Sequence, residues 1–171
     1  RHTLCAFQQH FPRRATACAA RLSRGRGPAP PHVSALQPNF VPAPGPDATP
    51  LGRAFGDVLV QPAATASPGT RVEVEFVSAH PKHNPRRNGT FLEVQRRTAS
   101  GRWERVANEG EWAVRFHWRS PGPGISLARF TWDIPADATP GRYRFQHFAD
   151  RLGGDGSLTP ITGTSDEFDI A

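Results

Sequence analysis

The sequence predicts an all-β fold: an antiparallel β-sandwich of immunoglobulin-like type over residues 55–171, preceded by a proline-rich linker and a short helical segment. Three observations lead to it. Apolar and polar residues alternate in a series of short runs, Gly and Pro turn signals separate the runs, and no helical pattern lies between them. The chain has 171 residues with 11 Phe and 4 Trp, which is enough apolar bulk for one core.

Residues 1–24 are expected to be helical. Leu4, Phe7 and Phe11 recur at helical spacing, and an alanine-rich stretch follows them. Pro12 predicts two short helices or a kink, because proline inside a helix costs about 3 kcal/mol. An Arg-rich transit peptide without acidic residues is the alternative interpretation. Since the sequence starts at Arg1 and contains no Met, we expect residues that precede it and regard the chain as a fragment.

Residues 25–54 are predicted to be a linker. Eight prolines lie between Pro28 and Pro50, where almost no periodic apolar pattern occurs. Proline at this density favours an extended, semi-rigid conformation, so we expect a spacer that runs along a surface or between domains.

Alternation with a period of two predicts the strands of residues 55–171. In the run 71–77, Val72, Val74 and Phe76 share one face, whereas Arg71 and the two glutamates share the other. The run 112–119 shows the same alternation, with Trp112, Val114, Phe116 and Trp118 on one face. The remaining expected strands are 57–60, 90–95, 103–107, 128–132, 143–147 and 167–170.

Charge and cysteine placement exclude several functional classes. The net charge of +6 comes from residues 1–46, which hold six Arg and no acidic residue, whereas residues 47–171 hold fifteen basic and fifteen acidic groups. The folded part is therefore neutral, which argues against nucleic acid as a partner. Cys5 and Cys18 both precede the linker, so no disulfide framework is expected in the sandwich. No apolar run is long enough for a membrane-spanning helix.

Catalytic and metal-binding patterns are not found in this chain. His80 and His83 lie among prolines without further ligands at metal-site spacing, which predicts a surface loop, and His117 and His147 fall within strands. Asp133 and Asp137 could form an acid–base pair but are interpreted as turn residues. Residues 163–166 are interpreted as a turn before the last strand and residues 153–156 as a flexible tip, since no nucleophile elbow or phosphate loop is present.

One local motif remains after these exclusions. Asn88-Gly89-Thr90 matches an N-glycosylation acceptor in a polar loop, which makes Asn88 a candidate modification site. Asn-Gly is also a common hairpin turn, and this alternative stays open.

The ordered set of segments resembles the C-terminal end of the neutral ceramidases. The similarity covers nearly the whole chain in the family's order, on both sides of the linker. The segments are His2-Thr3-Leu4, 22–25, 27–31, 49–59, 76–81 with Asn84, 89–92 with Val94, Trp112, Arg115-Phe116-x-Trp118, Trp132-x-Ile134-Pro135, Pro140-Gly141-x-Tyr143-Arg144, His147-Phe148, 163–165 and Phe168. Pro12, Cys5 and Cys18 depart from the family's pattern.

The resemblance implies a parent enzyme that hydrolyses the amide bond of ceramide to sphingosine and a fatty acid. Such enzymes use zinc to activate the attacking water and polarise the carbonyl. The family's zinc ligands lie upstream, so no catalytic or metal-binding residue is carried over to this chain, which alone is expected to be inactive. Residues 1–24 would be the remnant of the catalytic domain's last helix.

The partners implied are the upstream catalytic domain and a membrane surface that carries ceramide. The resemblance also implies an extracellular, secretory or membrane-associated location. An independent immunoglobulin-like binding or adhesion module is the alternative function, since sandwiches serve many functions.

Overall fold

The computed structural model describes residues 44–85 and 89–171, and these belong to one compact unit. The helix predicted for residues 1–24, residues 25–43 of the predicted linker and the candidate acceptor Asn88 lie outside the described residues.

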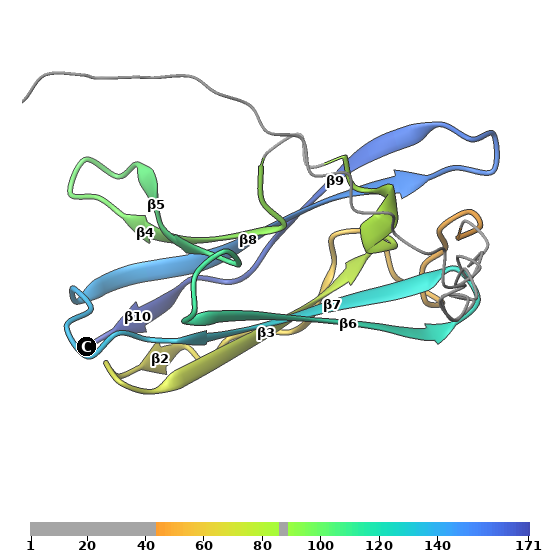
Figure 1. Ribbon diagram of the computed structural model, residues 1–171. Coiled ribbons are helices and arrows are strands. Elements are labelled where there is room, and N and C mark those ends of the chain that lie inside the picture. Colours follow the sequence, from red (N-terminus) through yellow and green to blue (C-terminus); the bar gives the residue numbers. More distant parts are fainter. Residues whose placement is uncertain (1–43, 86–88) are drawn as a thin grey trace, which may run out of the picture. The chain divides into compact units, whose positions relative to one another are not determined.

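The described chain is all-β, as predicted (Figure 1). Its only helical element is the single 3-10 turn η1, and no α-helix occurs within 44–85 and 89–171. The elements in order are β1 (Val58–Val60), β2 (Thr65–Ala66), β3 (Arg71–Ser78), η1 (Pro81–His83), β4 (Leu92–Arg97), β5 (Trp103–Asn108), β6 (Val114–Gly122), β7 (Ile125–Asp133), β8 (Gly141–Leu152), β9 (Leu158–Thr164) and β10 (Phe168–Ile170).

The strands form two sheets. The four-stranded sheet has the order β1-β3-β7-β6, and the six-stranded sheet has the order β2-β10-β8-β4-β5, with β9 also paired to β8. Neighbouring strands are antiparallel except β2 and β10, which run parallel with Thr65 opposite Asp169. The expectation of a purely antiparallel arrangement is therefore wrong at this edge, where β2 is only two residues long.

Both sheets contribute to one core. The alternation predicted for residues 71–77 is confirmed at its start, where Val72 and Val74 are at most 5% exposed while Arg71 and Glu73 are exposed. It is wrong from residue 75 on, because Glu75 is 2% exposed beneath its ion pairs with Arg119 and Arg129 and Val77 is buried as well. Aromatic rings then join the layers, with Phe116 stacked on Phe91 and Phe130, whose ring centroids lie 5.4 and 5.0 Å away. Because a fully buried Phe is worth about 3–5 kcal/mol against Ala, these rings dominate the stability of the sandwich.

Strands β2, β6 and β9 differ from the sequence prediction, and the short β2 was not predicted. The strand expected from residue 112 begins at Val114, so Trp112 lies outside it and is 99% exposed, and Trp118 on β6 is 39% exposed. Strand β9 was not predicted, because only Ile161 and Gly163 of its residues are buried. A Cβ on Gly163 would come within 2.7 Å of the Phe76 ring, which explains a glycine at a core position.

Candidate domain junction

The carboxylate of Asp47 ties the start of the described chain to the sandwich. Its Oδ1 accepts a hydrogen bond from His80 N at 2.8 Å, and its Oδ2 accepts one from Leu152 N at 2.7 Å. The Nδ1 atom of His83 lies 2.6 Å from the same Oδ2, and the Asp47 side chain is 1% exposed. A carboxylate is buried at low cost only where donors surround it, and three surround this one.

Further contacts hold residues 44–48 in place. Ala48 N donates to Gly124 O at 2.9 Å, and His83 Nε2 lies 3.3 Å from Pro44 O. A Cβ on Gly124, whose φ is +69°, would come within 2.7 Å of Pro46 O, so the turn between β6 and β7 needs glycine to let this segment approach. We call residues 44–48 with His80, His83 and Leu152 the Asp47 junction.

A small cavity of about 220 Å³ adjoins the junction. Its lining includes Pro44, Asp47, His80 and Trp118. The His80 ring meets the Trp118 ring edge-on, with 4.7 Å between centroids, and burial lowers the pKa of His80. Residues 44–48 are therefore joined to three separate parts of the fold: η1 with the preceding His80, the end of β8, and the turn between β6 and β7.

The junction corrects the prediction for the histidine pair. His83 was expected in a surface loop, but it belongs to η1 and its side chain is 8% exposed against Asp47. Sequence reasoning missed Asp47 because 36 residues separate it from His83. The available signal was that Asp47 is the first acidic residue of the sequence, at the end of an arginine- and proline-rich stretch.

His117 and His147, the two histidines predicted within strands, are not part of the Asp47 junction. His117 is exposed on β6, whereas His147 is buried on β8. His147 Nδ1 lies 2.7 Å from Phe91 O and Nε2 lies 2.8 Å from Ser78 Oγ, so Nδ1 carries the proton and Nε2 accepts from the serine. Burial lowers the pKa of His147 to about 4. Since both side chains are at most 2% exposed, no substrate can reach this serine–histidine pair and its role is structural.

The two aspartates considered as an acid–base pair, Asp133 and Asp137, have different surroundings. Asp133 ends β7, and its carboxylate accepts hydrogen bonds from Arg71 Nε at 2.5 Å and Arg115 Nη1 at 2.8 Å. These two arginines lower the pKa of Asp133. Asp137 lies exposed in the following turn. The interpretation of Asp133 as a turn residue is therefore wrong, because it ends β7 and its carboxylate pairs with arginine side chains on neighbouring strands.

Residues 153–156 and 163–166, both interpreted as turns or tips, adopt different structures. Residues 153–156 form the turn between β8 and β9, as predicted, with Gly153 N donating to Ser157 O at 2.8 Å. Gly163 and Thr164 end β9 instead of forming a turn, and Ser165 Oγ accepts a hydrogen bond from Phe145 N at 2.9 Å.

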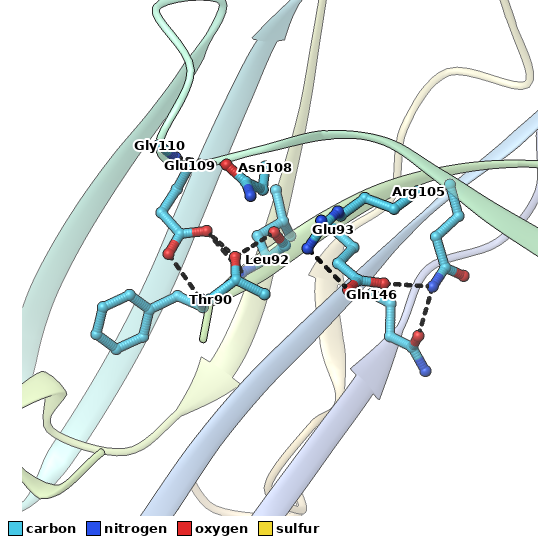
Figure 2. Close-up of polar contacts among 10 residues, drawn as sticks. Thr90, Leu92, Glu93, Arg105, Asn108, Glu109, Gly110 and Gln146 are labelled. Atoms are coloured by element: carbon cyan, nitrogen blue, oxygen red, sulfur yellow. Dashed lines mark hydrogen bonds and ion pairs between the residues drawn. The ribbon is translucent and has the colours of Figure 1, made fainter. Parts of the chain in front are cut away.

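The hydroxyl of the glycosylation motif is engaged in the fold. Thr90 is 2% exposed, and its Oγ1 donates to the Glu109 carboxylate and lies 2.8 Å from Leu92 O. Figure 2 shows the same carboxylate receiving backbone N–H groups, from Phe91 at 2.8 Å and from Leu92 at 3.2 Å. Glu109 thereby fixes the loop between β5 and β6 to the start of β4, and Thr90 has a structural reason that does not involve modification.

Metal binding and membrane crossing find no support in this region. Within residues 44–85 and 89–171, no group of three His, Cys, Asp or Glu side chains could hold a metal ion. The described residues therefore do not fit the zinc that the sequence resemblance implies. The described part also has no helix long and apolar enough to cross a membrane.

Relatives of the chain are known in bacteria and plants. The chain is 43% identical over 116 residues, 68% of its length, to the neutral ceramidase of Mycobacterium tuberculosis. It is 34% identical over 98% of its length to neutral ceramidase 2 of Arabidopsis thaliana. It spans only 18% and 23% of these two proteins.

A solved structure shows the same fold. The crystal structure of neutral ceramidase from Pseudomonas aeruginosa matches 78% of this chain and 22% of its own, with a TM-score of 0.74 and 31% sequence identity. Residues 11–170 match the family described as neutral/alkaline non-lysosomal ceramidase, C-terminal. Since this match includes nearly all of the sequence, the chain belongs to the C-terminal domain family of the neutral/alkaline non-lysosomal ceramidases.

Proposed function

We propose that the chain is the C-terminal domain of an amidohydrolase that cleaves ceramide to sphingosine and a fatty acid. One observation carries the proposal: the match runs through residues 11–170, on both sides of the proline-rich segment, in the C-terminal part of enzymes named neutral ceramidases. An independent binding module would have no reason to keep both sides of that segment in the family's order.

The chemistry belongs to the part of the enzyme that precedes this domain. We propose that zinc binds there, where it would polarise the amide carbonyl and activate water. The absence of a metal-binding group in the described residues supports this division of labour between the two parts. The domain itself supplies a rigid sandwich, and the Asp47 junction fixes the direction in which the chain enters it.

We also propose the immunoglobulin-like assignment and the division of the chain into 1–24, 25–54 and 55–171. Tyr143 at the start of β8 donates its hydroxyl to Thr139 O at 2.6 Å, and its ring lies 5.7 Å from that of Trp132. A tyrosine at a strand start bonding to backbone a few residues upstream is a feature of immunoglobulin-like sandwiches. The bonds of residues 44–48 support a linker whose last part lies along the domain surface.

Location is the least constrained part of the proposal. A ceramide substrate implies that the enzyme meets a membrane surface, and a secretory or extracellular location would make Asn88 available for glycosylation. The buried hydroxyl of Thr90 requires that any such modification precede folding, because its hydrogen bonds are satisfied inside the domain.

A hydrolysis assay tests the function. Three proteins are compared: this chain, the protein encoded by the sequence that precedes it, and one protein that contains both parts, which we call the joined protein. Release of fatty acid from N-acylsphingosine is expected from the joined protein and not from this chain; a zinc chelator should abolish it, and added zinc should restore it. Hydrolysis by this chain alone would place the active site within it, whereas a silent joined protein would favour the independent binding module.

A further inference from the structure

A cavity of about 300 Å³ lies between the two sheets, beside the turn that joins β7 to β8. Figure 1 shows β4 and β5 in one layer and β6 and β7 in the other. Arg96 and Ala107 line the cavity from the first layer, Trp132 lines it from the second, and Pro135 and Ala138 line it from the turn. Small-molecule sites in proteins begin at about this size. The space can therefore take a small ligand or the head of a larger one.

The buried side of the cavity is apolar and fixed. Trp132 and Tyr143 are each 2% exposed, and their ring centroids lie 5.7 Å apart. The Tyr143 hydroxyl donates to Thr139 O at 2.6 Å, which holds the ring against the turn. Val106 also lines the cavity and is 39% exposed, so apolar surface continues from the inside of the cavity to its mouth. Such walls favour an aliphatic group, because burying it removes apolar surface from water.

The wall of the cavity holds a buried donor without an acceptor. The indole Nε1 of Trp132 is enclosed, and no described residue accepts its hydrogen bond. An unsatisfied buried N–H is costly, and almost every such group in a folded protein has a protein or water partner. Because Trp132 lines the cavity, an oxygen that enters this space can serve as the acceptor. A hydroxyl or carbonyl oxygen on a ligand meets this requirement, and a water molecule is the alternative.

Two carboxylates at the mouth of the cavity have no ion-pair partner. Glu111, in the loop after β5, and Asp137, in the turn after β7, both line the cavity and are exposed. Neither forms an ion pair with another residue of the described chain. Arg96, the cation of the described lining, already donates Nε and Nη2 to Glu104 Oε1 at 3.1 and 2.6 Å. The mouth is therefore negative, so it attracts an ammonium group and repels a carboxylate.

We infer that this cavity binds an amphiphilic amine that carries a hydroxyl group. The ammonium lies at Glu111 and Asp137, and the hydroxyl oxygen accepts the hydrogen bond of Trp132 Nε1. The first part of the apolar chain lies against Tyr143 and Val106. The inference rests on the proposed function for the source of the ligand, because the proposed reaction releases sphingosine, an amino alcohol of this class. The other product, the fatty acid, carries a carboxylate that the mouth repels, so the domain distinguishes the two products by charge.

Nitrogen–proton NMR of the 171-residue chain tests the inference. Sphingosine is added below the concentration at which it forms micelles, and N-acetylsphingosine and the fatty acid are the comparison ligands. The indole N–H signal of Trp132, identified by sequential assignment, should move downfield with sphingosine as the group gains an acceptor. N-acetylsphingosine, which has no ammonium, should bind about tenfold more weakly, and the fatty acid should leave the signal unchanged.

Replacing both carboxylates removes the charge of the mouth without changing the core. Glu111→Gln combined with Asp137→Asn should weaken sphingosine binding about tenfold and leave the binding of N-acetylsphingosine unchanged. Asp166→Asn is the matched control, since Asp166 is exposed and does not line the cavity, and it should leave the affinity for sphingosine unchanged. All three side chains are exposed, so both variants should fold, which urea unfolding checks.

Each alternative gives a different result. An unmoved Trp132 signal overturns the inference and leaves water as the partner of the indole. An equal response to the fatty acid overturns it, as does a response that appears only once sphingosine forms micelles. Ceramide hydrolysis by the joined protein is measured separately. Hydrolysis without sphingosine binding by this chain refutes the amine site alone, whereas sphingosine binding with a silent joined protein supports the amine site and refutes the proposed activity.

Discussion

Replacing Asp47 with alanine is the most direct test of the junction. The change removes the acceptor of three donors, which are His80 N, Leu152 N and His83 Nδ1. None of the three has water at hand to replace it, because the Asp47 side chain is 1% exposed and that of His83 is 8% exposed. The variant should therefore lose stability well beyond that of a surface change.

The magnitude follows from the burial of these groups. A hydrogen bond to a charged group contributes about 1.5–3 kcal/mol, and a buried donor left without its acceptor adds a desolvation cost. Residues 44–48 are partly or fully exposed, so water can reach the site once the carboxylate is gone, which limits the loss. We expect Asp47→Ala to lower the free energy of unfolding by about 3 kcal/mol, at the top of that range. Asp47→Asn keeps one acceptor oxygen and should lose about half as much.

Urea unfolding of the 171-residue chain, followed by tryptophan fluorescence, measures both variants. Asp137→Ala is the control, since Asp137 is exposed in a turn, and it should shift the free energy by no more than about 0.5 kcal/mol. If Asp47→Ala behaves like this control, the hydrogen bonds of the junction contribute nothing to stability and the reasoning from burial is refuted.

Three further predictions concern buried polar groups. The pKa of His147 lies near 4 in the folded chain and near its ordinary value of 6.5 in the unfolded chain. The contribution of neutral His147 to stability is therefore complete above pH 6.5 and falls by about 3 kcal/mol as pH decreases toward 4. His147→Gln should flatten this pH dependence in urea titrations. Thr90→Ala should cost about 1–3 kcal/mol in thermal unfolding because Glu109 loses a donor. Glu75→Gln should cost about 1–2 kcal/mol at pH 7, and this cost should shrink as pH falls below the ordinary value of 4.5, because Arg119 lowers the pKa of this buried carboxyl and the ion pair is lost as pH falls through the lowered pKa; a cost that stays constant throughout acid titration contradicts this account.

Local alternation predicted the strands of the core, and longer-range contacts decided the rest. Val72, Val74 and Phe76 follow the predicted pattern because their face lies in one core cluster with Leu92, Val94 and Phe145 of the other sheet. The same alternation failed at Trp112, because residues 109–113 form a turn that Glu109 holds to the start of β4. Which face of a strand a residue occupies can be assigned from sequence, but the residue at which the strand begins cannot, because that depends on contacts with distant parts of the chain.

The junction was hidden from sequence for a related reason. A buried charge is recognisable only together with its partners, and those of Asp47 are a histidine 36 residues away and the backbone of Leu152, 105 residues away. Backbone donors carry no sequence signal at all. Composition predicted a linker over residues 25–54, yet it could not indicate that the described part of this segment would bond to η1 and β8.

The polar groups of this domain that resemble chemical machinery are already used inside the fold, and this sets how its variants should act. Ser78 and His147 bond to each other, and Asp47 and Glu109 are surrounded by donors. Substitutions there should change ceramide hydrolysis by the joined protein only as far as they change its stability. When hydrolysis by the joined protein is plotted against stability, Asp47→Ala and His147→Gln should therefore share one curve. A variant of Asp47 or His147 that falls well below this curve would show that the side chain acts in catalysis and would refute the purely structural role assigned to it.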